Sequence, residues 1–150
     1  MRIHHLSNSD VTTAPREMSL LAAAKLMRER HVGDVVVIEQ RGAAQLPVGI
    51  VTDRDIVLGA IAQDIDDLSK VHVGDLAPSP CHVIGRDDRI ENAIDIMQLH
   101  GVRRLPVVND RGELEGIVTY DDVVSWMLST LASLSRSFTK QRCREEIRRP

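Results

Sequence analysis

Apolar and polar positions along this chain follow spacings that predict a repeated order of secondary structure. Apolar residues recur three, four and seven positions apart in 20–27 and again in 90–97, the spacing of an amphipathic helix. A short extended piece precedes each helix, and two apolar strands joined by a turn containing Arg-Gly follow it. The predicted strands are 11–14, 35–38 and 48–51 in one half, and 81–84, 105–108 and 114–118 in the other. A second helix is predicted to begin at Asp53 and at Tyr120.

Self-comparison shows that the two halves are copies of one unit. An offset of 70 aligns Met27 with Met97, and an offset of 67 aligns the Gly-Ile-Val-Thr segments 49–52 and 116–119. The first copy therefore carries three extra residues within 43–48, where a hairpin connection tolerates them. The order strand, helix, strand, strand, helix occurs twice, which predicts an α+β (mixed α/β) fold. The expected units are 1–64, 65–134 and a basic helical tail, 135–150.

The composition of the chain argues against several classes of function. The chain has 150 residues, a net charge of −3 and three aromatic residues, which argues against a general nucleic-acid or membrane-surface binder. The absence of a membrane-length apolar run and of a signal-peptide core leads us to expect a cytoplasmic protein without membrane contact. Cys81 and Cys143 form no CxxC, and the six histidines lack metal-ligand spacing, so neither a disulfide scaffold nor a metal site is supported.

The C-terminal part differs from the rest in charge and in apolar pattern. Six basic and two acidic residues give 135–150 a net charge of +4. Two interpretations stay open: a solvated helix end, or a docking tail for a partner or a neighbouring subunit. An apolar stripe precedes the tail and needs a cover, so we expect a homodimer. The stripe consists of Val124, Met127, Leu131 and Leu134.

The most informative motifs are the segments 49–55 and 116–122. In each, a glycine and two apolar residues end a strand, a threonine follows, and an aspartate stands three positions later. One interpretation is structural, because Thr-x-x-Asp is close to a capping box at a helix N-terminus. The other is functional: a helix N-terminus and a hydroxyl can hold a phosphate, a carboxylate can accept from ribose hydroxyls, and glycine permits close backbone approach. The two interpretations are compatible, because one threonine can cap the helix and also contact a ligand.

These paired Gly-h-h-Thr-x-x-Asp motifs, where h is apolar, resemble those of CBS domains. The strand Arg103–Val108, the segment Val73–Leu76 and the pairs 31–32 and 101–102 support the resemblance, which covers about residues 1–134. It implies tandem CBS domains packed as a pseudo-twofold pair, a Bateman module, with two clefts that often bind adenosine nucleotides. Carried over, the ribose residues are Asp55 and Asp122, the phosphate-side residues are Thr52 and Thr119, and the residues bordering adenine are Thr12 and His82.

The two copies differ at the start of the central strand. The second has Arg103 and Arg104, where family members often place basic residues facing phosphate. The first has Gly33 and Asp34. A carboxylate near phosphate is unfavourable, so Asp34 either pairs with one of the two arginines or is a plain surface charge.

These observations predict a non-enzymatic regulatory module that binds an adenosine-containing ligand and passes the signal to an unidentified protein partner. AMP, ADP or ATP is the expected ligand, with S-adenosylmethionine and NAD as further candidates, and no cofactor is required. The alternative is a dimeric scaffold with degenerate clefts that binds no ligand. A third interpretation, a nucleic-acid binder using the basic tail, is less well supported.

Overall fold

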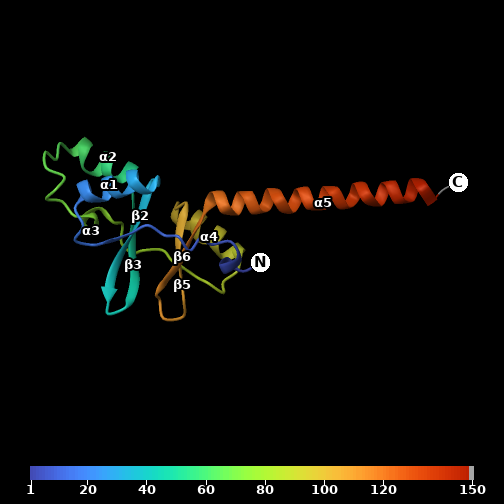
Figure 1. Ribbon diagram of the computed structural model, residues 1–150, viewed down its shortest axis with the longest axis horizontal. Coiled ribbons are helices and arrows are strands. Elements are labelled where there is room, and N and C mark those ends of the chain that lie inside the picture. The colour runs from blue at the N-terminus through green and yellow to red at the C-terminus, as the bar shows by residue number, and fades with distance from the viewer. Residues whose placement is uncertain (149–150) are drawn as a thin grey trace.

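A computed structural model describes the backbone of residues 1–148 and the side chains of residues 1–136 (Figure 1). Two three-stranded sheets, each with its helices, form the body of the molecule, and a long C-terminal helix projects away from it. This is the mixed α and β architecture that the hydrophobic pattern predicts. The predicted fold class is confirmed.

Each copy contains the same five elements in the same order. The first copy consists of β1 (Thr13–Pro15), α1 (Leu20–Arg30), β2 (Asp34–Arg41), β3 (Ala44–Thr52) and α2 (Asp53–Gly59). The second consists of β4 (Ile84–Gly85), α4 (Ile90–His100), β5 (Arg104–Val108), β6 (Leu114–Thr119) and α5 (Tyr120–Arg148). Short helical turns precede or join them: η1 (Ile3–His5), η2 (Ile61–Gln63) and α3 (Val73–Leu76).

The two sheets share one topology but differ in the length of the hairpin. In both, the first strand runs parallel to the second, and the second runs antiparallel to the third. The β2–β3 ladder continues as far as the pair Arg41 and Ala44, whereas β5 ends at Val108. The extra residues predicted in 43–48 therefore lengthen β3 instead of forming a loop. Their backbone groups are satisfied by the ladder rather than by water.

Each copy has its own hydrophobic core, and a third cluster joins the two. The helices α1 and α4 bury the predicted apolar faces, including Met27 and Met97. Between the copies, Val36, Ile38 and Ile117 are buried against one another, and β3 lies next to β6. Burial of this apolar surface holds the two copies in one body.

The segments that lead into the two copies are exchanged. Ile3 is fully buried in the core of the second copy, and its backbone N–H donates to Asp88 O at 3.0 Å. Val73 is fully buried in the core of the first copy, next to Val71, whose carbonyl accepts from Leu20 N at 2.8 Å. The chain thus crosses between the copies on both sides. A division at residue 64 stays a prediction, because contacts run across it.

Two glycines allow these crossings. A Cβ on Gly49 would lie 2.7 Å from Ala77 Cβ, and one on Gly116 would lie 2.9 Å from Asn8 O. Both distances are shorter than real Cβ atoms tolerate. The close backbone approach that the motif glycines permit is made by the chain's own lead-in segments.

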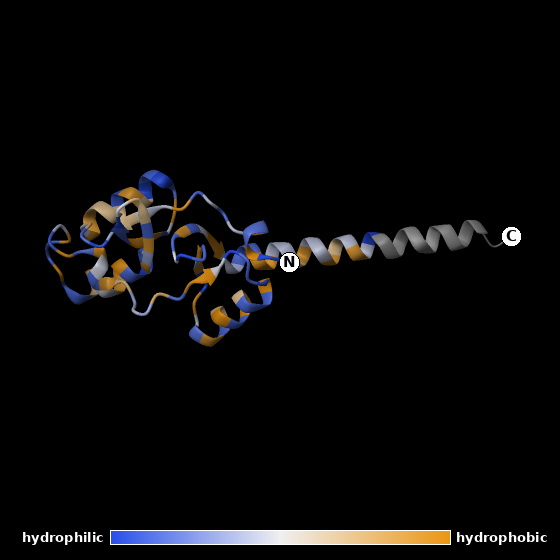
Figure 2. Ribbon diagram, turned by 90° about the horizontal axis from the view of Figure 1, so that it is seen from below, coloured by the Kyte–Doolittle hydropathy of each residue, from blue (hydrophilic) through white to orange (hydrophobic). Residues whose placement is uncertain are grey.

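The helix α5 leaves the body soon after it begins (Figures 1 and 2). Bands of apolar residues are visible along it in Figure 2. Met127, Leu128, Leu131 and Leu134 are about half exposed or more. The predicted basic tail lies largely outside the described side chains, which end at Arg136.

Candidate functional site

Both predicted Thr/Asp pairs form capping boxes. Asp55 N donates to Thr52 Oγ1 at 3.1 Å, while Thr52 N and Oγ1 donate to Asp55 Oδ2 at 2.8 and 2.7 Å. The pair Thr119 and Asp122 repeats this geometry at 3.2, 2.8 and 2.6 Å. The motifs therefore start the helices α2 and α5, as their structural interpretation predicts.

The capping role leaves part of each carboxylate available. In both pairs the hydrogen bonds go to Oδ2 of the aspartate. All four side chains are half-buried rather than sealed inside a core. A carboxylate has two oxygens and about four acceptor positions, so Oδ1 of Asp55 and of Asp122 can still accept a hydroxyl group. The structural and the ligand-binding interpretations are compatible in this geometry.

An ion pair crosses between the copies at the start of the central strands. Arg104 Nε lies 3.0 Å from Asp34 Oδ1. These two residues hold the same repeat position, since an offset of 70 separates them. Residues related by a twofold can touch only near its axis, so this pair marks the pseudo-twofold axis of the module. The sequence left Arg103 and Arg104 as possible partners of Asp34, and the structure shows that the partner is Arg104.

This ion pair is shielded from solvent. The side chains of Asp34 and Arg104 are 17% and 35% exposed. Burial raises the pKa of the Asp34 carboxyl, the Arg104 guanidinium opposes that rise, and the Asp53 carboxylate adds to it. Asp53 is held nearby because its N–H donates to Gly33 O at 2.9 Å. Asp34 is thus influenced by one guanidinium and by one further carboxylate.

Arg104 also lines a cavity between the two copies, together with the predicted residue His82. The cavity has a volume of about 200 Å³. Its walls come from β3, from the segment before β4, from the end of α4 and from the start of β5, namely Gly49, Ile50, Pro78, Ser79, Pro80, Cys81, His82, His100, Val102 and Arg104. It is smaller than a typical small-molecule pocket of about 300–1,000 Å³. A nucleotide would have to widen it.

Two histidine rings border this cavity. The rings of His82 and His100 stack with their centroids 3.7 Å apart and their planes 15° apart. Sequence reasoning missed His100, because its contact with His82 depends on tertiary packing. A flat ring at His82 is also a surface on which a purine can stack.

The neighbouring Cys81 belongs to the same wall. Burial raises the pKa of its thiol to about 11. The thiol is therefore protonated near neutral pH, which is the state of an inert cysteine and not of a nucleophile.

The other predicted residues lie apart from this cavity. Thr119 is the register partner of Arg104, which places the Asp122 capping box one strand away from the cavity wall. The pair Thr52 and Asp55 belongs to the first copy, where Thr52 is the register partner of Asp34. Thr12 precedes β1, and its carbonyl accepts from Val36 N at 2.9 Å. It holds the repeat position of His82, so the first copy has an equivalent arrangement without the ring.

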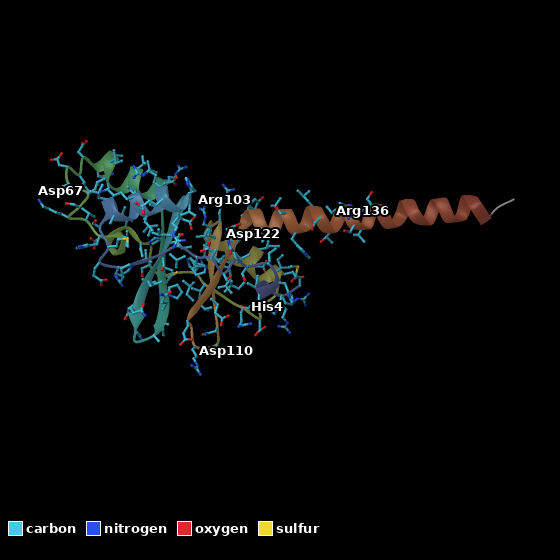
Figure 3. The ribbon with its side chains drawn as sticks, viewed as in Figure 1. His4, Asp67, Arg103, Asp110, Asp122 and Arg136 are labelled. Atoms are coloured by element: carbon cyan, nitrogen blue, oxygen red, sulfur yellow. The ribbon has the colours of Figure 1, made fainter. Side chains whose placement is uncertain are left out.

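The structure separates the two adjacent arginines. Arg103 is 71% exposed, lies 3.7 Å from Asp121 and holds its guanidinium 5.4 Å from the centre of the Tyr120 ring. Figure 3 shows Arg103 and Asp122 close to the point where α5 begins. Arg103 directly precedes β5 and is not among the residues that line the Arg104 cavity.

Arg103 instead lines a larger apolar groove of about 780 Å³ between α4 and α5. The groove is formed mainly by apolar side chains of both helices, including Ile94, Met97, Val123, Val124 and Met127. It continues into the exposed stripe of α5, because Val124 and Met127 belong to both.

Neither a metal centre nor a membrane span is found in the part of the chain that the structure describes. Among these residues, no three side chains of His, Cys, Asp or Glu gather closely enough to hold a metal ion. The helices described are too short or too polar to cross a bilayer.

Comparison with known proteins identifies the family. The model of the CBS domain matches residues 3–60 and 73–129. This chain therefore belongs to the CBS domain family and carries two CBS domains, which confirms the resemblance seen in the sequence. A Methanopyrus kandleri protein of uncharacterised function is 31% identical over 134 residues, 87% of this chain and 66% of that protein. The chain thus spans just under two thirds of this relative's length.

Solved structures agree with this assignment. The crystal structure of Hypoxic Response Protein I, which has two coordinated zinc ions, is 30% identical and superposes with a TM-score of 0.72 over 83% of this chain and 98% of that one. A CBS domain protein from Pyrobaculum aerophilum, complexed with AMP, is 26% identical with a TM-score of 0.72, covering 81% and 89%. The hexameric CBS-CP12 protein from bloom-forming cyanobacteria is 25% identical with a TM-score of 0.71, covering 83% and 69%.

Proposed function

We propose that this protein is a non-enzymatic regulatory module that binds an adenosine nucleotide between its two CBS domains. The observation that carries the proposal is the cavity in which Arg104 and His82 meet, one strand away from the Asp122 capping box. A cation, a flat ring and a carboxylate oxygen match the phosphate, the base and the ribose of one nucleotide. The AMP complex of the Pyrobaculum aerophilum protein supports this ligand class.

The roles follow from the placement of the side chains. Arg104 binds the phosphate with Thr119 at the helix N-terminus, Asp122 binds the ribose, and His82 borders the adenine. The first copy offers the equivalent set Thr12, Thr52 and Asp55, with Asp34 in place of the arginine. We leave Arg103 out of the phosphate site because it lines the α4–α5 groove instead.

A thermal-shift and calorimetry panel tests this proposal. Adenosine, AMP, ADP, ATP, S-adenosylmethionine and NAD are each titrated into the full chain, with Zn²⁺ as a separate arm because one structural neighbour coordinates zinc. A ligand at a hundredfold its Kd stabilises the folded state by about 2.7 kcal/mol. Arg104→Gln should weaken ATP and ADP more than adenosine, and Arg103→Gln is the matched control that should not. If no nucleotide binds at millimolar concentration, the scaffold without ligand becomes the better description.

We also propose that two copies of this chain pair along α5. Val124, Met127, Leu131 and Leu134 recur at alternating spacings of three and four, the seam that a helix uses to pack against a similar helix. Met127, Leu131 and Leu134 of this seam are exposed, and the seam is continuous with the α4–α5 groove, so the same partner would cover both.

Light scattering of two matched variants tests the pairing. The double variant Met127→Glu, Leu131→Glu places charges in the seam and should be a monomer that keeps its fold by circular dichroism. Ser129→Glu adds a charge on the opposite side of the same helix and should stay dimeric. A double variant that remains a dimer would place the interface elsewhere.

A further inference from the structure

The pseudo-twofold axis carries opposite charges at equivalent positions. Asp34 and Arg104 occupy the same repeat position and touch each other at 3.0 Å. Two arginines or two aspartates there would repel, since like charges at this distance are unfavourable. One residue of each sign makes the contact attractive. It also means that the cation facing the cavity is already neutralised by a carboxylate of the other copy.

The partial burial of this pair increases the strength of its interaction. Both side chains are mostly shielded from water, and Asp53 brings a second carboxylate close to Asp34. Charges interact more strongly where solvent screens them less. Any anion that approaches Arg104 in the cavity therefore meets the field of Asp34 and Asp53 as well as that of the guanidinium.

From this geometry we infer that Asp34 competes with the ligand's phosphate for Arg104. The inference rests on the proposed function and adds to it the residue that sets phosphate selectivity. A bound phosphate must share Arg104 with Asp34 or displace Asp34 from it. Asp34 therefore lowers the affinity for a ligand more strongly as the negative charge of that ligand increases. The module then favours weakly charged adenosine ligands over triphosphates more than an unpaired arginine would.

The same competition links binding to the contact between the copies. The pair joins β2 of the first copy to β5 of the second. A phosphate that takes Arg104 loosens this connection, whereas adenosine leaves it in place. Phosphate-bearing ligands and adenosine thus differ in their effect on how the two CBS domains contact each other, which is the change that a partner protein can detect.

Titration of Asp34→Asn with adenosine, AMP and ATP tests the inference. Removal of the carboxylate charge should leave adenosine affinity unchanged, raise AMP affinity about three- to tenfold, and raise ATP affinity about ten- to a hundredfold. The matched control is Glu39→Gln, which removes one charge from the same strand on an exposed side chain away from the cavity. It should change none of the three affinities.

Two other outcomes would overturn the inference while leaving the proposed function intact. If Asp34→Asn weakens AMP and ATP binding, Asp34 orients Arg104 for phosphate instead of competing with it. If AMP and ATP bind Asp34→Asn as they bind Glu39→Gln, the carboxylate has no influence on the ligand. Absence of nucleotide binding to the wild-type chain and to Asp34→Asn would overturn the proposed function together with the inference.

A charge-swapped variant keeps the test valid if Asp34→Asn loses stability. The double variant Asp34→Arg, Arg104→Asp retains an ion pair on the axis but moves its cation to the first copy. In a Cys143→Ser background, the slow alkylation of Cys81, which lines the His82 cavity, reports occupancy of that cavity. AMP should slow the alkylation in the wild-type chain and not in the swapped variant. Equal protection in both would contradict the assignment of Arg104.

Discussion

The two CBS domains share their folding devices and differ in the chemistry around their axis. Both have a Thr/Asp capping box of the same geometry, a strand glycine crossed by a lead-in segment, and a parallel first strand. They differ at the axial position, where Asp34 faces Arg104, and at one repeat position ahead of the first strand, which holds Thr12 in the first copy and His82 in the second. The residues that the two copies share therefore serve mainly to form the fold. The residues that differ give the two clefts different chemistry.

The two strand glycines are expected to give the largest effects on stability. A Cβ on Gly49 would meet Ala77 Cβ at 2.7 Å, so Gly49→Ala should destabilise the fold by about 1–3 kcal/mol in urea unfolding. Because the obstacle is a side-chain atom, Ala77→Gly should restore much of this loss in the double variant. No recovery in the double variant would mean that the strain lies elsewhere.

The equivalent glycine of the second copy should not be rescued in this way. A Cβ on Gly116 would meet the backbone oxygen of Asn8, which also accepts a hydrogen bond from Ile117 N at 2.9 Å. Gly116→Ala should cost about as much as Gly49→Ala. Changing the side chain of Asn8 to glycine should not relieve it, because the clashing atom belongs to the main chain. A large coupling between positions 8 and 116 would contradict this difference.

The two capping aspartates should be equal in stability and unequal in binding. Asp55→Ala and Asp122→Ala each remove the acceptor of two hydrogen bonds, so each should cost about 0.5–2 kcal/mol of folding free energy. Asp122 follows Thr119, the register partner of Arg104, whereas the first copy has Asp34 in place of that arginine. If Arg104 binds the phosphate, Asp122→Ala should lower nucleotide affinity about ten- to a hundredfold and Asp55→Ala should lower it less. Each variant is the matched control of the other in calorimetry. Equal losses of affinity would separate Asp122 from the ribose.

Much of the fold could be predicted because its signals are local. Apolar spacing identified both helices, and the repeat offset gave the order of strands. The exchange of the lead-in segments could not be predicted, since Ile3 and Val73 present similar apolar side chains and either core accepts either one. The length of the first hairpin could not be predicted either, because the sequence of 43–48 does not show whether the added residues form a loop or pair with the preceding strand, as Ala44, Gln45 and Leu46 do.

Part of the candidate site could also be predicted, because part of it depends on residues that are close in the sequence. The capping boxes depend on residues three positions apart, and both were read from the sequence. The ion pair between Asp34 and Arg104 depends on how the two copies pack. The sequence limited the possible partners of Asp34 to two arginines but did not choose between them. The two arginines are adjacent in the sequence, which alone did not show that they line different cavities. His100 comes to His82 through tertiary packing, and its ring contact has no local signature.

The two copies also differ at the position of Cys81, because the equivalent residue of the first copy is Val11. Of the two, only the second copy therefore has a thiol at this position. Burial raises the pKa of this thiol from 9.0 to about 11, which leaves about a hundredfold less thiolate below pH 9. The greater nucleophilicity of a more basic thiolate offsets part of this, so iodoacetamide should react about tenfold more slowly than with a model thiol. The measurement uses Cys143→Ser as the background. The rate should keep rising with pH until about 11, and a plateau near pH 9 would show an exposed thiol.

The smallest effect is expected at the ends of the two equivalent helices. His31 ends α1 with φ 54° and Gly101 ends α4 with φ 64°, both in the left-handed region. This conformation costs a residue with a Cβ about 1 kcal/mol and costs glycine little. His31 is exposed, so His31→Gly should stabilise the fold by about 0.5–1 kcal/mol after the added freedom of glycine in the unfolded chain is included.

Two further variants separate backbone strain from loss of the imidazole ring. His31→Ala removes the ring but keeps the Cβ, so its urea midpoint should stay near that of the wild-type chain. Gly101→Ala introduces the same strain into the second copy and should lower the midpoint by a similar amount. If His31→Ala stabilises as much as His31→Gly, the ring and not the backbone is the source of the strain, and the two helix ends are not equivalent.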